Sequence, residues 1–320
     1  MQFVNSMPYA GEEIGNCDLP TAFAMYFGTP VPLVAAHTGI KIGKRNARGA
    51  QLTLDAYGDA LTNTVFPGGG WTTAHDSTKW LISELLKSAS INHTCEVYGL
   101  FASCMDQQGA DANASFNGRK RQGLVPDFLI RWTDKDQLLE LKTFHQSKLH
   151  FPDCDLKNGE RCTGAKRRAS HINKEYVNKA RNADRELNGH TTEGLGPLGK
   201  RLAMFGTVQG LAIGPRGEAS ADFHKLIEKI GEVGAERGWR KTGARSVAEA
   251  KALITPRLYR AIGINAVRAA AHLVRDNLGL SLLGNAEGVQ TCLNNSHFFT
   301  RSHRQEYYDT FCNAPNGFVS

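Results

Sequence analysis

Apolar positions along residues 74–240 follow the pattern of a domain that contains both helices and strands. Helical spacing from Trp80 to Ala89 predicts a helix that is capped at its start by Asp76-Ser77. Later runs rich in β-branched and aromatic residues predict strands. The predicted strands cover residues 94–102, 124–132, 137–144 and 203–213. A polar turn at residues 133–136 is expected to join the second and third strands into a hairpin.

Helices are expected before the last strand and after it. A basic helix is predicted at residues 170–187, and a helix with an apolar stripe from Phe223 to Val233 follows the last strand. The expected fold class is therefore α/β, with an αβββαβ core around a mixed sheet. Residues 1–73 mix short apolar runs with Gly and Pro, which predicts a lead-in with little regular structure. Residues 241–320 are expected to form an extension with helices at 246–254 and 257–278, then a tail.

Composition limits the class of protein. The 320 residues are 41% hydrophobic and 22% charged, which is typical of a packed globular chain. The longest apolar runs are too short to cross a bilayer, and residues 1–5 lack the basic and apolar regions of a secretory signal. Seven cysteines without a CxxC pair favour reduced thiols. We therefore expect an intracellular protein, nuclear or cytoplasmic, with no membrane partner.

The candidate chemistry is concentrated in Asp127, Glu140 and Lys142. Glu140 and Lys142 are two residues apart on one predicted strand, so their side chains point to the same face. Asp127 opens the partner strand, and the hairpin can bring its carboxylate beside Glu140. Two adjacent carboxylates suit Mg²⁺ or Mn²⁺, which would polarise a phosphodiester and lower the pKa of a bound water. Lys142 would orient that nucleophile or neutralise charge on phosphorus.

Alternatives remain open around this motif. The same pattern arises by chance on exposed hairpins whose charges are merely solvated. A further acid usually completes such a site, and Glu96 on the first predicted strand is preferred to Glu84, which belongs to the polar flank of the first helix. The expected metal ligands are therefore Asp127, Glu140 and Glu96. His75 is expected to be a helix cap or a phosphate contact.

Basic residues flank the motif. Residues 166–185 contain seven lysines and arginines and two acids, which leaves a charge of +5. Such a surface binds the backbone of a polyanion without reading its sequence, although a solvated helix face is the more common meaning of a basic run. Tyr176 and Lys179 are spaced to face the hairpin from this helix. The expected nucleic-acid contacts are Arg121, Lys166, Arg167, Arg168, Lys174, Tyr176, Lys179 and Arg181.

Two weaker signals have ordinary explanations. Cys154, Cys162 and His171 lack the spacing of a structural zinc site, so we expect loop cysteines. Residues 217–224 include a serine and a histidine, but a helix cap at Ser220 or Asp222 explains most of this segment.

Three segments together resemble a known family: residues 95–101 (CEVYGLF), 121–128 (RQGLVPDF) and 139–142 (LELK). Their order is similar to that of PD-(D/E)XK, or restriction-endonuclease-like, domains associated with reverse-transcriptase reading frames of eukaryotic retroelements. The resemblance implies a restriction-endonuclease-like fold, catalytic places for Asp127, Glu140 and Lys142, and an accessory acidic role for Glu96. It also implies a nuclease that nicks target DNA, with a reverse transcriptase as a partner.

Three functions follow from these patterns. The leading hypothesis is a retroelement-derived, metal-dependent DNA endonuclease. An RNA nuclease is an alternative, because the motif does not distinguish the sugar. The third is a nucleic-acid-binding or assembly module that has the fold without the activity. The sequence departs from the family because the paired cysteines of a zinc knuckle and the Tyr-x-Asp-Asp run of a reverse transcriptase do not occur in it.

Overall fold

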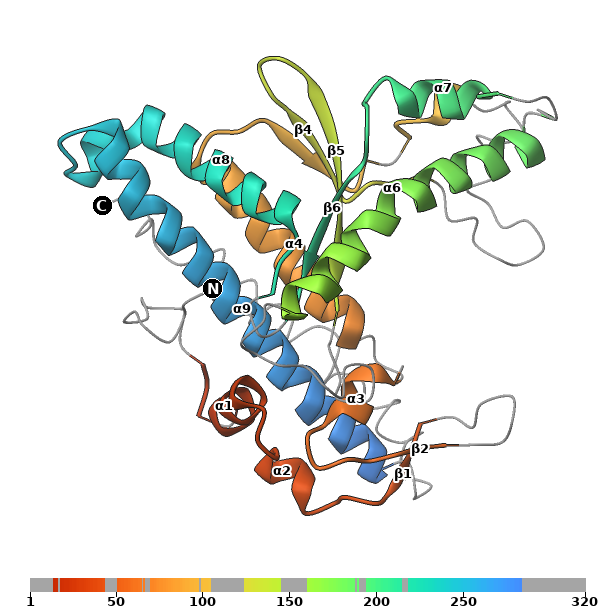
Figure 1. The fold of residues 1–320 in the computed structure, drawn as a ribbon, viewed down its shortest axis with the longest axis vertical. Coiled ribbons are helices and arrows are strands. Elements are labelled where there is room, and N and C mark those ends of the chain that lie inside the picture. Colours follow the sequence, from red (N-terminus) through yellow and green to blue (C-terminus); the bar gives the residue numbers. More distant parts are fainter. Residues whose placement is uncertain are drawn as a thin grey trace.

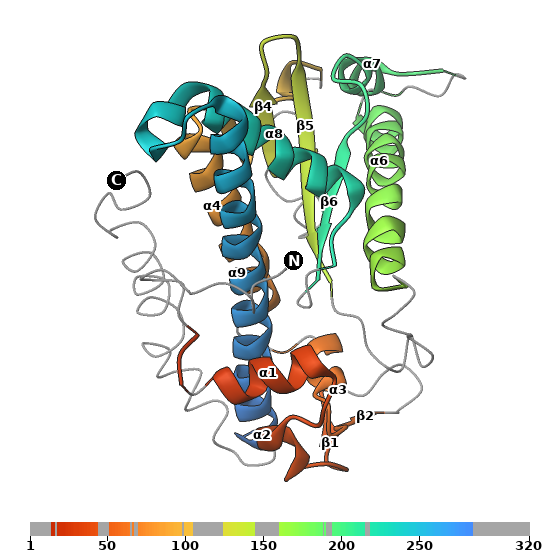
Figure 2. The same ribbon diagram turned by 60° about the vertical axis from the view of Figure 1, so that its left-hand side comes forward.

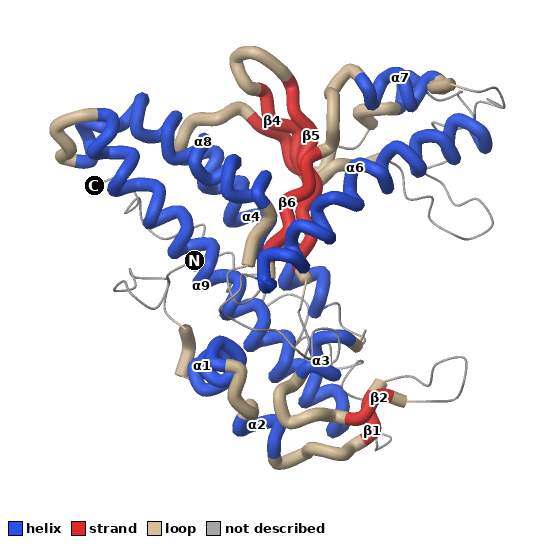
Figure 3. The backbone as a smooth tube through the Cα atoms, viewed as in Figure 1, coloured by secondary structure: helices blue, strands red, loops and turns tan. Residues whose placement is uncertain are grey.

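A mixed four-stranded sheet lies at the centre of the fold (Figure 3). The computed structural model describes residues 14–16, 18–43, 51–64, 66, 70–97, 99–104, 124–144, 160–187, 189, 194–214 and 218–283. In spatial order the strands are β3 (His93–Cys95), β4 (Phe128–Arg131), β5 (Asp136–Thr143) and β6 (Gln209–Ile213). β3, β4 and β5 are antiparallel, whereas β5 and β6 are parallel. The expected α/β class with a mixed sheet is confirmed.

Helices cover both faces of this sheet (Figures 1 and 2). One face packs against α4 (Gly70–Ser88), α8 (Ala221–Gly238) and α9 (Val247–Leu283). The other packs against α6 (Glu160–Leu187) and α7 (Pro197–Ala203). Because side chains alternate along a strand, β5 contributes to both faces.

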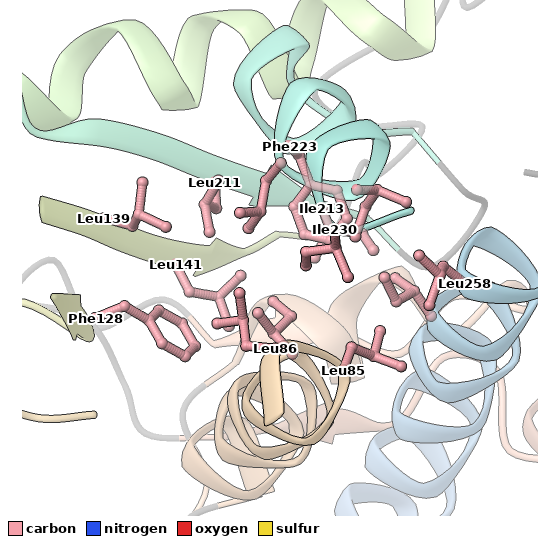
Figure 4. Close-up of a cluster of buried hydrophobic side chains, with 14 of the residues drawn as sticks. Leu85, Leu86, Phe128, Leu139, Leu141, Leu211, Ile213, Phe223, Ile230 and Leu258 are labelled. Atoms are coloured by element: carbon pink, nitrogen blue, oxygen red, sulfur yellow. The ribbon is translucent and has the colours of Figure 1, made fainter. Parts of the chain in front are cut away.

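The larger apolar core lies between the sheet and the α4, α8 and α9 helices (Figure 4). Leu86, Leu141 and Phe223 meet there from α4, β5 and α8, and all three are fully buried. Leu258 joins them from α9. Burial of each such side chain contributes about 1.5–3 kcal/mol relative to its exposure to water. The second core, under α6 and α7, is smaller, and Leu138 is its member from β5.

The N-terminal region is folded onto the far end of α9 (Figure 1). Its elements are α1 (Leu19–Phe27), α2 (Pro32–Ala35), β1 (Lys41–Ile42), β2 (Leu52–Thr53) and α3 (Asp59–Asn63). Their apolar residues pack against Val274 and Leu278. Asp18 is buried and forms ion pairs with His272 (2.6 Å) and Arg275 (2.5 Å). The expectation of little regular structure before residue 73 is therefore wrong, because these short elements are stabilised by partners more than 200 residues away.

Several predicted boundaries also need correction. α4 begins at Gly70, so Asp76 and Ser77 lie inside the helix and do not cap it. The first strand ends at Cys95, because Glu96 has a φ of 48° and turns the chain out of the sheet. Ala102, which was expected to end that strand, instead begins the 3₁₀ turn η1 (Ala102–Cys104).

The later elements differ from the prediction in three places. α6 begins at Glu160, ten residues earlier than expected. α7 was not predicted, and β6 is therefore shorter than the strand expected at 203–213. After η3 (Trp239–Thr242), the two expected C-terminal helices form the single helix α9, which continues through Pro256 because packing against α8 outweighs the hydrogen bond that proline removes.

Other expectations are confirmed. β5 covers almost the whole predicted third strand, and the expected turn is closed by a hydrogen bond from Trp132 N–H to Lys135 O of 3.0 Å. Ser220 caps α8 by accepting a hydrogen bond from Phe223 N–H at 3.3 Å. Among the helices in the described ranges, none has the length and hydropathy needed to cross a membrane.

Candidate functional site

The β4–β5 hairpin brings Asp127 to the backbone of the Glu140–Lys142 segment. The strand register pairs Phe128 with Leu139, which places the preceding residue, Asp127, opposite Glu140. Asp127 Oδ2 accepts a hydrogen bond of 2.8 Å from the N–H of Leu141, the residue between Glu140 and Lys142. All three residues of the predicted motif therefore meet at one end of the hairpin.

Both oxygens of the Glu140 carboxylate have hydrogen-bond donors. Lys142 Nζ lies 2.6 Å from Oε1, and the Tyr176 hydroxyl lies 2.7 Å from Oε2. Glu140 is only 7% exposed, whereas the Lys142 side chain is 36% exposed. Glu140 and Lys142 share a face because they are alternate residues of β5, as predicted. The result is a buried carboxylate beside an ammonium group that solvent can reach.

Tyr176 connects α6 to this motif. Burial is the main cause that raises the pKa of its hydroxyl, followed by the charges of Glu140 and then Asp127. Tyr176 faces the hairpin as expected, but it is only 3% exposed. Its role as a nucleic-acid contact stays a prediction, and its ring and hydroxyl are enclosed by protein.

His75 joins Asp127 to helix α4. Its Nε2 lies 3.1 Å from Leu141 O and 3.5 Å from Asp127 Oδ2, and its Nδ1 lies 3.2 Å from Asp76 Oδ1. Burial opposes protonation, but the hydrogen bonds to Asp127 and Asp76 outweigh it and raise the pKa of His75 to about 9. The ring is thus protonated at neutral pH. His75 is inside α4 and does not cap it.

Glu96 lies next to Asp127 through the backbone, because its N–H donates a hydrogen bond of 2.9 Å to Asp127 O. Its carboxylate forms an ion pair with Lys79 of α4, and Lys79 Nζ also lies 3.0 Å from Asp76 Oδ1. Burial lowers the pKa of Lys79, but the hydrogen bonds to Glu96 and Asp76 outweigh it and leave that pKa raised. The Glu96 carboxylate therefore contacts α4, as Asp127 does through His75, whereas Glu140 contacts Tyr176 of α6. Its expected place in the site is not supported.

Lys79 was missed by the sequence reasoning, although a signal for it exists. Its side chain is only 3% exposed. It precedes the buried residues Ile82 and Leu86 by three and seven positions, so it occupies the apolar stripe of its helix. A lysine at such a position indicates a buried ionic partner. Glu84, by contrast, pairs with Lys87 at 2.6 Å on the exposed flank, as expected.

The donor set decides which cation these residues fit. Within the described ranges, no three or more His, Cys, Asp or Glu side chains are grouped so as to hold a metal ion. Asp127 and Glu140 alone provide two carboxylates, each with about four lone-pair positions. Mg²⁺ commonly takes one or two protein carboxylates and completes its shell with water and substrate phosphate. The pair therefore fits Mg²⁺ or Mn²⁺ of that kind, and does not fit the expected three-carboxylate site.

α6 presents basic side chains to solvent. Lys166, Arg167, Arg168, Lys174 and Arg181 are exposed, and no acid in the described part of the chain forms an ion pair with them. Lys179 is half-buried, with its Nζ 5.5 Å from the centre of the Tyr176 ring. α6 therefore combines an exposed positive surface with one contact to the carboxylate site.

Some predicted residues cannot be placed. Arg121 and Cys154 lie outside the described residues. Cys162 lies within α6, where its side chain is not described, and His171 is exposed on the same helix. Comparison with known proteins found no family model, no curated protein and no solved structure that matches this chain.

Proposed function

We propose that this protein is a metal-dependent endonuclease that hydrolyses phosphodiester bonds, with DNA as its substrate. The observation that carries the proposal is the 2.8 Å hydrogen bond from Leu141 N–H to the Asp127 carboxylate. It brings Asp127 to Glu140 and Lys142, which follow it by 13 and 15 residues in the sequence. The order of the core elements, with α7 inserted before β6, supports a restriction-endonuclease-like fold.

The residues of the site have distinct parts in this reaction. Asp127 and Glu140 would hold Mg²⁺ or Mn²⁺, which supplies Lewis acidity to the phosphodiester and to an attacking water. Lys142, whose ammonium group is partly exposed, neutralises negative charge that develops on the phosphate. Protonated His75, whose Nε2 lies 3.5 Å from Asp127 Oδ2, helps the Leu141 N–H to hold this carboxylate against β5.

The nucleic-acid nature of the proposed substrate follows from α6, and DNA in particular from the sequence resemblance. The exposed cations of α6 have no acidic partners in the described ranges, so they remain available to phosphates. Contacts of this kind position a nucleic acid without selecting its sequence. Origin from a retroelement, and a reverse transcriptase as partner, rest on the sequence resemblance alone.

One observation favours a second function, nucleic-acid binding without hydrolysis. Lys79 binds the Glu96 carboxylate, and within the described ranges no three acidic, histidine or cysteine side chains are grouped to hold a metal ion, whereas the sequence predicted three carboxylate ligands. Such a protein would bind nucleic acid through α6 and cut nothing.

A cleavage assay separates these functions. Wild-type protein is incubated with plasmid, single-stranded DNA and RNA, each with Mg²⁺, Mn²⁺ or EDTA. We expect metal-dependent DNA cleavage that is lost in Asp127→Asn and Lys142→Met. Lys225→Met is the matched control, because Lys225 also pairs with a neighbouring acid but lies on α8. Cleavage in EDTA, or by Asp127→Asn, overturns the proposal, and preferential cleavage of RNA changes the substrate. Binding without cleavage establishes the second function.

A further inference from the structure

The hydroxyl of Tyr176 contacts the Glu140 carboxylate and the backbone just before Asp127. It lies 2.7 Å from Glu140 Oε2 and 3.1 Å from the carbonyl oxygen of Val125, two residues before Asp127. A phenol has a single proton to donate. The shorter contact and the negative charge both favour donation to Glu140, because hydrogen bonds to ionised acceptors are shorter and stronger.

Packing alone does not account for this hydroxyl. The Tyr176 ring belongs to the apolar cluster under α6, with Leu129, Leu138 and Ile172 among its neighbours. A phenylalanine would fill the same space. What the oxygen adds is a donor aimed at a carboxylate that is itself only 7% exposed. The role of the hydroxyl is therefore the hydrogen bond that it donates to Glu140.

The two donors to Glu140 differ in how firmly they are held. Lys142 has a long flexible stem and a side chain that is 36% exposed, and in the proposed reaction it contacts the phosphate. Tyr176 has two side-chain torsions and is enclosed by the core. The terminal torsion of a glutamate is soft, so its carboxylate plane needs a fixed partner. When Lys142 turns toward a phosphate, Tyr176 remains as that partner.

We infer that Tyr176 is a positioning residue, which fixes the Glu140 carboxylate in the orientation that binds a divalent cation. The inference rests on the proposed function, because it concerns the same cation. Tyr176 occupies one lone pair of Oε2 and Lys142 one of Oε1, so the remaining lone pairs of the carboxylate are open to a cation. Partners of this kind, which hold a ligand without touching the metal, typically contribute 10- to 100-fold to metal affinity.

Direct measurement of Mn²⁺ binding tests this role. Free Mn²⁺ is followed by electron paramagnetic resonance as it is titrated into wild type, Tyr176→Phe and Tyr259→Phe. The control tyrosine also bonds an acid, Glu228, but lies on α9 outside the site. We expect the dissociation constant for Mn²⁺ to rise about 10- to 100-fold in Tyr176→Phe and to stay within about twofold in Tyr259→Phe. Cleavage by Tyr176→Phe is expected to return toward the wild-type rate at saturating Mn²⁺, since every catalytic group remains.

The outcomes distinguish this inference from the proposed function. Equal Mn²⁺ affinities of wild type and Tyr176→Phe overturn the role of Tyr176 and leave the nuclease proposal intact. A lower melting temperature with unchanged Mn²⁺ affinity does the same, because it shows a purely structural hydroxyl. Absence of Mn²⁺ binding by the wild type, checked for folding by circular dichroism, overturns both.

Discussion

The two faces of the central sheet hold their acidic residues by opposite means. On the α4 face, Asp76 and Glu96 share the buried Lys79, so the charges are matched within the protein. On the α6 face, Glu140 is bound by a neutral hydroxyl and by a lysine that solvent can reach, beside a helix with exposed cations. The α4 face is therefore suited to hold the fold together. The α6 face has positive charge available for a polyanion.

Substitution of one acid on each face is expected to give the largest difference in the rate of DNA cleavage. Glu140→Gln removes a carboxylate of the proposed cation site, so we expect DNA cleavage with Mg²⁺ to fall about 10³-fold or more. Glu96→Gln leaves that site intact, and cleavage should stay within about threefold once folded protein is compared. Initial rates of plasmid nicking measure both. A loss of similar size in Glu96→Gln would mean that Glu96 joins the site after all.

Truncation of one core residue on each face compares their contributions to stability. Phe223→Ala, in the larger core, is expected to lower the free energy of unfolding by about 3–5 kcal/mol. Leu198→Ala, in the smaller core under α7, should cost nearer to 2 kcal/mol. Urea denaturation followed by circular dichroism gives both values. A larger loss of unfolding free energy in Leu198→Ala than in Phe223→Ala would contradict the smaller contribution expected of the core under α6 and α7.

The pH dependence of stability should be a property of the α4 face. Burial raises the pKa of Asp76, but hydrogen bonds from His75 and Lys79 outweigh it and leave the pKa below 3.8. Its contribution is thus present above about pH 4 and lost as pH falls through the lowered pKa. We expect Asp76→Asn to destabilise the protein by about 1 kcal/mol at pH 6 and by less at pH 3. Melting curves in EDTA across this range test it, and a pH-independent difference would contradict it.

The smallest effect concerns single cations of α6. Arg167→Gln removes one exposed charge, so the slope of log affinity for DNA against log salt concentration should decrease in magnitude by about 1. Lys225→Gln, on α8, is the control and should leave the slope unchanged. Fluorescence anisotropy with a labelled duplex at several salt concentrations measures both. Equal slopes for the two variants would contradict the expected contact between α6 and DNA.

The part of the site that could be predicted depends on local periodicity. Alternation along β5 sufficed to place Glu140 and Lys142 on one face, and the short turn sufficed to bring Asp127 opposite them. The Ser220 cap is equally local. The position of Glu96 could not be predicted, because it depends on a positive φ and on Lys79 in a different element. The contact of Tyr176 with Glu140 depends in the same way on how α6 crosses the sheet.

The length of α9 has a consequence for the order in which the chain is made. Residues 18–63 are synthesised before the part of α9 that covers their apolar side chains and pairs with Asp18, which lies at residues 272–278. For more than 200 residues of synthesis this segment has no native surface to fold against. During that time the apolar side chains that α9 covers later stay exposed, which favours aggregation of a nascent or truncated chain.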